Sequence, residues 1–496
     1  MRSNSLLLLF ISAFIFLSSC SKKDELNPLP TSLITEGSAF STSSRVLNQV
    51  YGLYATFKLT GLYGSEYPVY SDIKAGDFIS TNLNPNIGAL TYMCQVESGS
   101  PEVNQVWRHA YQLINGCNVF LDGMETSGKE VVGDSLGTLY EAEVRGLRAI
   151  AYYSLLQLYA QPYTKDNGAS PGLPLRLTPN EGLQDYSLAR SSVAEVYQQV
   201  LDDLDYAESN LPLKYSTASM NTTRLHKNSA IAFKTRVYLA MGKYDKVIAE
   251  ASKIVSSSAP YSAAGSGGVA NALEADIATV FKAPYTSLES IFSVPFSSND
   301  VPGIPLASYY LPVAASATGL GSVGQGQYYL YADGIIADPG WSATDARRSF
   351  IFTTPSGGSA GVKWLTKFKV GTPFTDNCPV IRYAEVLLNL SEALLRQNGD
   401  ASIADARGLL EAVRHRSDPT YVVSAATTAD LLSAIIDERH IEFLGEGLRN
   451  TDLMRLGLEI PMKAPAGSIS VPAVPASADN YIWPLPNEEL LYNPGL

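Results

Sequence analysis

The stretch ERHIEFLGEGLRNTDLMRLG, Glu438 to Gly457, decides the fold because it carries more charge than a surface helix can use. Its glutamates recur at i, i+4 and i+8, which stacks the carboxylates of Glu438, Glu442 and Glu446 along one helical face. Carboxylates at this spacing repel one another, so cations must compensate them. The stretch supplies three guanidinium groups, on Arg439, Arg449 and Arg455, each able to bind a carboxylate at two points. The pattern therefore predicts a structural ion-pair clamp between one helix, the glycine-containing turn after it and the next helix.

Paired carboxylates also serve glycosidases, where they face one another across the substrate. Glutamates one turn apart on one helix point the same way and cannot do this. We therefore interpret these carboxylates as structural and expect no catalytic residue among them.

The same stretch resembles the signature of the SusD/RagB family, the nutrient-binding outer-membrane lipoproteins of Bacteroidetes-type bacteria. It departs from that signature at Asn450 and Thr451, where the family often carries aromatic residues. Residues 141–159, 380–394 and 481–494 also resemble the family's first long helix, C-terminal helix and chain end, so the resemblance covers nearly the whole mature chain. The signature positions are Glu438, Arg439, Glu442, Phe443, Glu446, Gly447, Arg449, Asp452, Leu453, Arg455 and Gly457.

Composition places the chain among large acidic globular proteins. Its 496 residues are 46% hydrophobic, which allows an extensive core, and length alone predicts about two to four units. A net charge of -12 argues against binding to a phosphate backbone, because nucleic-acid proteins need a basic face. We expect no nucleic-acid partner.

The N-terminus has the pattern of an export signal. Arg2 precedes an apolar run from Leu6 to Leu17 that is too short to span a bilayer, so residues 1–19 are predicted to be a signal peptide. The sequence Leu-Ser-Ser-Cys that ends at Cys20 resembles the bacterial lipoprotein box, which implies acylation of Cys20 and stable membrane anchoring. The alternative is a plain signal peptide that ends near a cysteine. Residues 20–35 are expected to be a flexible tether.

The sequence contains no convincing motif for a metal site or a nucleotide-binding site. The remaining cysteines, Cys94, Cys117 and Cys378, do not have zinc-site spacing, and three of them cannot all pair in disulfides. The four histidines never approach a His-x-x-x-His spacing. Residues 319–324 satisfy a Gly-x-Gly-x-x-Gly pattern but lack the flanking strand and helix that bind a pyrophosphate. We expect no metal and no cofactor.

Helical periodicity dominates the middle and the end of the chain. Apolar residues spaced by three and four predict a long helix over 141–159 and helix hairpins over 228–255 and 381–413. The first hairpin resembles a tetratricopeptide unit. Thr427 and Asp430 predict a capping box for the helix that carries Glu438. The expected fold is mainly α, with irregular tetratricopeptide-like hairpins, long loop-rich insertions and a few short strands. We expect an N-terminal region over 36–255 and a C-terminal region over 256–496.

Two segments, 61–105 and 256–361, are loop-rich and contain many Gly, Ser, Pro and Tyr residues. Long insertions on a rigid scaffold tend to carry binding residues. Sugars are bound by aromatic faces together with carboxylates and amides. On this basis the candidate ligand-binding residues are Asp77, Asn82, Tyr92, Tyr329 and Trp341.

The resemblance implies a non-enzymatic lipoprotein that is anchored in the outer membrane and faces the cell exterior. Such a protein would bind a nutrient, an oligosaccharide in our interpretation, and deliver it to a SusC-like TonB-dependent transporter. Three alternatives stay open. The first is a peptide-binding member of the same uptake system, and the second is a glycoside hydrolase with two carboxylates across a cleft. The third is a purely structural surface protein, which no ligand would stabilise.

Overall fold

A computed structural model describes residues 36–80, 83–84, 87–182, 186–313, 324–355, 359–371, 373–464 and 469–496. The predicted signal peptide, Cys20 and the tether lie outside the described residues, and so does Asn82. Most of the Gly-x-Gly-x-x-Gly pattern lies outside them as well.

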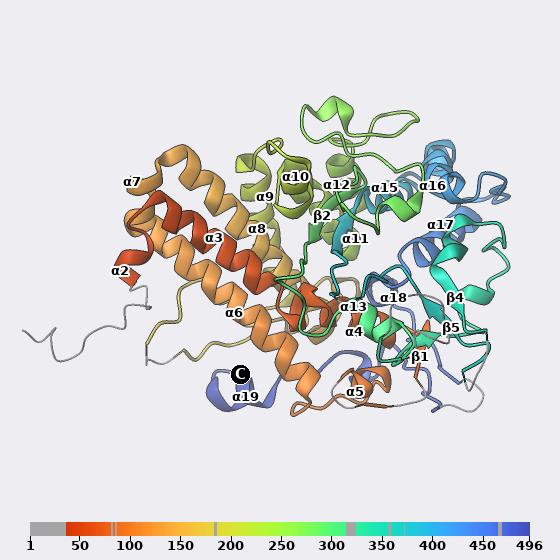
Figure 1. The fold of residues 1–496 in the computed structure, drawn as a ribbon, viewed down its shortest axis with the longest axis horizontal. Coiled ribbons are helices and arrows are strands. Elements are labelled where there is room, and N and C mark those ends of the chain that lie inside the picture. The colour runs from red at the N-terminus through yellow and green to blue at the C-terminus, as the bar shows by residue number, and fades with distance from the viewer. Residues whose placement is uncertain are drawn as a thin grey trace, which may run out of the picture.

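The scaffold is a succession of helices in which each long helix packs against the next. In Figure 1 the run begins with α3, α6 and α8 on the left, continues through α9, α11 and α12, and ends with α15, α16 and α17 on the right. The long helices are α3 (Ser43–Phe57), α6 (Pro101–Gly123), α8 (Asp134–Tyr159), α9 (Val193–Asn210), α11 (Lys227–Ala240), α12 (Tyr244–Ala251), α15 (Tyr383–Asn398), α16 (Ile403–Ser417) and α17 (Thr428–Glu442). The expectation of a mainly helical, tetratricopeptide-like scaffold is confirmed.

Shorter helices fill the connections between the long ones. They are α2 (Glu36–Ala39), α4 (Glu66–Lys74), α5 (Ala89–Tyr92), α7 (Lys129–Val132), α10 (Ala218–Thr223), α13 (Leu306–Tyr310), α18 (Arg449–Arg455) and α19 (Asn487–Tyr492).

Local sequence explains where several helices begin and end. The predicted capping box is present at α17, where the Thr427 side chain accepts from the backbone N–H of Asp430 and the Asp430 side chain accepts from that of Thr427. Gly242 separates α11 from α12 at a φ of 67°, which glycine adopts without strain. One predicted boundary was wrong, because Ile381 belongs to a strand and α15 begins at Tyr383. Its apolar side chain suits a buried strand as well as a buried helix.

The described strands form small antiparallel pairs. Each pair joins segments that the helices hold in place, and β1 and β3 connect the two loop-rich segments. The pairs are β1 (Phe78–Ile79) with β3 (Tyr329–Leu330), β2 (Ser290–Val294) with β6 (Cys378–Arg382), and β4 (Ile351–Thr353) with β5 (Lys363–Leu365).

The main hydrophobic core is one continuous cluster that runs from Phe40 to Trp483 along the sequence. α8 lies deep within it, and its leucines Leu147, Leu155 and Leu158 are fully buried. Each buried leucine contributes about 1.5–3 kcal/mol relative to an exposed one. No helix in the described ranges has both the length and the apolar character needed to cross a bilayer. The three described cysteines are buried and unpaired.

Candidate functional site

The glutamates of the 438–457 stretch lie in a buried ion-pair network. Glu442 accepts from three arginines: Arg347 at 2.9 Å, Arg382 at 3.0 Å and Arg416 at 2.6 Å. Glu446 lies 2.7 Å from Lys367, and Glu438 lies 2.8 Å from Arg414. α17 ends at Glu442, so Glu446 reaches this network from the following turn and not from the helix.

The expected partners of these glutamates were wrong. Arg439 and Arg455 instead bind Asp452, at 3.0 and 2.8 Å, and Arg455 also binds Glu392 at 2.7 Å. Among the described residues, Arg449 forms no ion pair within 4.0 Å. The reason is geometric, because neighbouring positions on a helix point in different directions. The glutamate stripe therefore faces cations from distant segments, while Arg439 faces α18 and α15.

Both networks are structural in character. Burial alone would raise the pKa of Glu442, but the charges of Arg416, Arg382 and Arg347 outweigh it and hold the pKa well below its ordinary value. A carboxylate held ionised in this way cannot donate a proton to a leaving group. The network joins α16 and α17 to β6 and to the 345–347 turn, so it fixes the scaffold beside the loops.

The two loop-rich segments meet at β1 and β3. Ile79 pairs with Tyr329, and the backbone N–H of Tyr331 donates to the carbonyl of Asp77 at 2.7 Å. Asp77 and Tyr329, two of the predicted ligand residues, are thereby brought together. The buried Asp77 carboxylate lies 2.6 Å from His440 Nε2. Burial would raise the pKa of Asp77, but His440 lowers it below the ordinary value.

The four described ligand candidates differ in exposure. Tyr329 is half-buried, and its ring lies edge-on to Trp364 at 5.7 Å. Tyr92 is fully buried, with the Lys463 ammonium 4.6 Å from its ring centre. Trp341 is also buried, with the Arg348 guanidinium 4.1 Å from its ring centre. Of these four candidates, Tyr329 is the one whose aromatic ring is not buried, so a ligand could contact it. We call the surface around Tyr329 on β3 the aromatic face.

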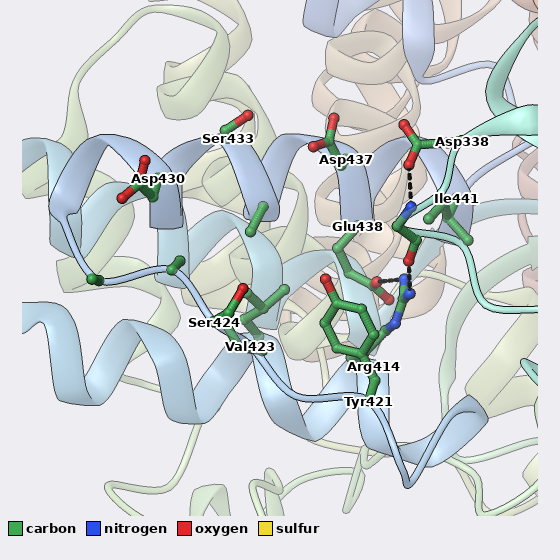
Figure 2. A pocket seen from close by; sticks show the side chains of 15 residues that line it. Asp338, Arg414, Tyr421, Val423, Ser424, Asp430, Ser433, Asp437, Glu438 and Ile441 are labelled. Carbon is green, nitrogen blue, oxygen red and sulfur yellow. Dashed lines mark hydrogen bonds and ion pairs between the residues drawn. The ribbon is translucent and has the colours of Figure 1, made fainter.

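A pocket of about 480 Å³ lies between α16, α17 and the turn at Asp338, and we call it the acidic pocket (Figure 2). α17 contributes Asp430, Ser433 and Asp437, whose spacing places them on one side of the helix. Burial raises the pKa of Asp437, and the negative charge of Asp338 raises it further. The other labelled lining residues are Arg414, Tyr421, Val423, Ser424, Glu438 and Ile441.

The pocket adjoins the predicted residue Trp341. The backbone N–H of Trp341 donates to the carbonyl of Asp338 at 3.0 Å, and Arg414 donates to the carbonyl of Gly340. Trp341 thus supports the turn that forms one wall of the pocket. Carboxylates and hydroxyls of this kind can accept and exchange hydrogen bonds with sugar hydroxyl groups.

Sequence reasoning missed several residues of these two surfaces. Trp364 lies in a short strand and donates its ring N–H to Thr354 at 2.8 Å. It was missed because the candidate residues were chosen within the two loop-rich segments, and Trp364 lies outside both. Asp338 and Asp437 lie far apart in sequence, so their meeting was not predictable from spacing. Within the described ranges, no group of three or more His, Cys, Asp or Glu side chains is placed to hold a metal ion.

Comparison with known proteins agrees with this architecture. A family model described as "SusD family" matches residues 358–496, and one described as "Starch-binding associating with outer membrane" matches residues 36–239. A crystal structure of a SusD superfamily protein from Bacteroides fragilis is 30% identical, with a TM-score of 0.79, and the match covers 92% of this chain and 99% of that one. The chain belongs to the SusD superfamily.

Two further proteins are similar over most of their length. SusD-like protein P2 of Formosa agariphila is 24% identical, over 98% of this chain and 97% of that protein. Surface glycan-binding protein A of Bacteroides thetaiotaomicron, solved in complex with laminarihexaose, is 19% identical with a TM-score of 0.72, over 92% of this chain and 98% of that one. The latter likeness establishes a shared fold.

Proposed function

We propose that this protein binds an oligosaccharide at the outer membrane and does not cleave it. The observation that carries this proposal is the β1–β3 pairing, which unites two loop-rich segments into one face on a rigid helical scaffold. Tyr329 offers a half-buried ring there, and the acidic pocket offers carboxylates and hydroxyls from α17 and from the turn at Asp338. These are the groups that recognise sugar rings and sugar hydroxyls.

The relatives support this proposal by what they bind. One matching family model is described as starch-binding, and a structural neighbour was solved with a bound laminarihexaose. Family membership also favours a binding protein over an enzyme, because the matching family and the structural neighbour are both known for binding.

Within the proposed site, the candidate residues take different roles. Tyr329 contacts the sugar directly. Asp77, Tyr92 and Trp341 are buried, so they support the walls that present the contact residues. Asn82 stays in the proposed set as a donor and acceptor for sugar hydroxyls.

The cellular setting is proposed from the N-terminal sequence and the family. Cys20 carries the lipid anchor, residues 20–35 form the tether, and the protein lies in the outer membrane with its loops toward the exterior. A SusC-like TonB-dependent transporter receives the cargo. Metabolic labelling with palmitate should mark the wild type and not Cys20→Ser, and an unlabelled wild type would remove the anchor from the proposal.

A thermal-shift screen tests the binding proposal. The protein lacking residues 1–20 is heated with panels of glycans and peptides, because a ligand that binds only the folded state raises the melting temperature. Stabilisation by at least one oligosaccharide is expected. Stabilisation by peptides alone would favour the peptide-binding alternative and overturn the glycan assignment.

One observation keeps the hydrolase alternative testable. Asp338 and Asp437 come from different elements and line one pocket, and the raised pKa of Asp437 is a property that a general acid needs. Incubation with each stabilising glycan should yield no product. Turnover that is lost in Asp437→Asn would show that the protein is a hydrolase.

A further inference from the structure

A separate pocket of about 500 Å³ shares no lining residue with the acidic pocket and does not include Tyr329. Its walls come from the segment before α6, the C-terminal end of α8 and the segment around Trp483. Apolar side chains supply much of the lining, and Arg190 supplies a cation. The residues that matter for its chemistry are Glu97, Ser98, Arg190, Asp479 and Asn480.

Arg190 is held in place by neutral backbone carbonyls. Its Nε donates to the carbonyl of Gly172 at 2.7 Å, and its Nη2 donates to that of Pro171 at 2.8 Å. Nη2 also donates to the carbonyl of Tyr159 at 3.5 Å, so the bonds use Nε and Nη2. Because the group carries five N–H donors, the bonds fix its orientation and leave donor capacity for a ligand on Nη1.

The charge of Arg190 has no ion-pair partner among the described residues, which sets it apart from the arginines of the buried networks. Glu97 and Asp479 are exposed members of the pocket, and neither lies within 4.0 Å of the guanidinium. Partial burial accordingly lowers the pKa of Arg190. A bound anion would supply the charge compensation that the protein does not.

We propose that this pocket binds an oxyanion, a carboxylate or a sulfate group, carried on a sugar. Arg190 binds the oxyanion, and the apolar lining formed by Val96, Pro484 and Leu485 receives the sugar body. The identification of the carrier as a sugar rests on the proposed function, whereas oxyanion binding does not. The pocket therefore gives the protein a means to select acidic saccharides over neutral ones.

The carboxylates of Glu97 and Asp479 at the rim of the pocket give a second test of the proposal. Glu97 and Asp479 repel an approaching anion, but both are exposed, so solvent and salt screen them more than they screen the partly buried Arg190. Removing these two charges should strengthen oxyanion binding, which is the opposite of the effect expected if they were ligand contacts.

Isothermal titration of the protein lacking residues 1–20 at low ionic strength tests the proposal. The probes are glucuronate, glucose 6-sulfate and neutral glucose. Either or both acidic probes should bind and glucose should not, and comparison of the two acidic probes distinguishes a carboxylate site from a sulfate site. Arg190→Gln should weaken binding about tenfold or more, the loss of one charge-assisted contact, and Arg190→Lys should lose less.

Two controls keep the outcome clear. The double variant Glu97→Gln/Asp479→Gln retains the Arg190 clamp and should bind the acidic probe more tightly, so it decides the question even if Arg190→Gln fails to fold. Glu459→Gln removes an exposed carboxylate that does not line this pocket, so it should leave binding of the acidic probe unchanged and separate the rim effect from a change in net charge. Failure of the wild type to bind either acidic probe, equal binding by Arg190→Gln, or weaker binding by the double variant would overturn the proposal.

Discussion

Glu442 lies where three guanidinium groups converge in the interior, and its charge holds them together. Removing the carboxylate would leave Arg347, Arg382 and Arg416 under-compensated in a site that water does not reach. Breaking a buried ion pair on one side costs about 3–5 kcal/mol. Glu442→Gln should therefore lower the free energy of unfolding by about that amount, measured by denaturant titration.

The matched control is Glu459→Gln, an exposed position without an ion pair in the described ranges, which should change stability by less than about 0.5 kcal/mol.

The contribution of Glu442 to stability depends on pH in a definite direction. Because the folded-state pKa of Glu442 is depressed, its contribution is present above the unfolded pKa and is lost as the pH falls. When the pH is lowered below about 4, the free energy of unfolding should therefore fall less in Glu442→Gln than in the wild type. Equal stability of variant and wild type at pH 7 would contradict the structural role.

Glu66 shows the opposite behaviour at the residue scale. Burial raises its pKa from 4.5 to about 7, and Glu66 has no ion-pair partner within the part of the chain that the structure describes. A raised folded-state pKa gives stability that is present below about pH 4.5 and lost as the pH rises through 7. The wild type should lose about 2.5 kcal/mol from this group between pH 5 and pH 8. Glu66→Gln should remove that loss, as unfolding titrations at both pH values would reveal. A parallel fall in the two proteins would contradict the assignment.

Charge patterning in the sequence predicted that the glutamates of the 438–457 stretch need cations, but it could not predict which ones. Their partners Arg347 and Arg382 lie far away in sequence and reach Glu442 only through tertiary packing. The same limit applies to Asp338 and Asp437 in the acidic pocket. Local periodicity carries no information about contacts between residues that are far apart in the sequence.

At the scale of elements, the turn between α17 and α18 depends on glycine. Gly447 has a φ of 78°, and its backbone N–H donates to Asp72 at 3.1 Å. A Cβ at this position would lie 2.6 Å from Pro68 Cα, so alanine adds a backbone clash to the cost of a left-handed conformation.

Gly457 provides a control with matched conformation. Its φ is 65°, and a Cβ there would meet nothing within 4 Å. Gly457→Ala should cost about 1–2 kcal/mol, the left-handed penalty alone, and Gly447→Ala should cost clearly more in the same denaturant titration. Equal losses in the two variants would show that the close approach to Pro68 has no energetic weight.

Helices were the most predictable elements, because apolar spacing and the Thr427 capping box are local signals. The short strands were harder. β1 and β3 are each two residues long, and their pairing depends on where the scaffold places two distant loops. The candidate set drawn from those loops could be chosen by residue type, but burial of Tyr92 and Trp341 follows from packing that the sequence does not reveal.

At the scale of the whole molecule, a single helical scaffold holds two loop-rich segments against one another (Figure 1). Buried ion pairs join that scaffold to β6 beside the loops. If the proposed function holds, this arrangement keeps the binding face preformed, so little conformational entropy is lost when ligand binds. Binding affinity should therefore respond to residues of the aromatic face without change in overall stability.

Isothermal titration with the oligosaccharide that most stabilises the protein tests the central claim most directly. Tyr329→Ala is compared with Tyr492→Ala, which removes a tyrosine that is 77% exposed on the C-terminal helix α19. The account predicts that Tyr329→Ala weakens binding about tenfold, the value of one lost stacking contact, while Tyr492→Ala binds like the wild type. Unchanged affinity in Tyr329→Ala, with both variants folded, would contradict the assignment of glycan binding to the face where β1 and β3 meet.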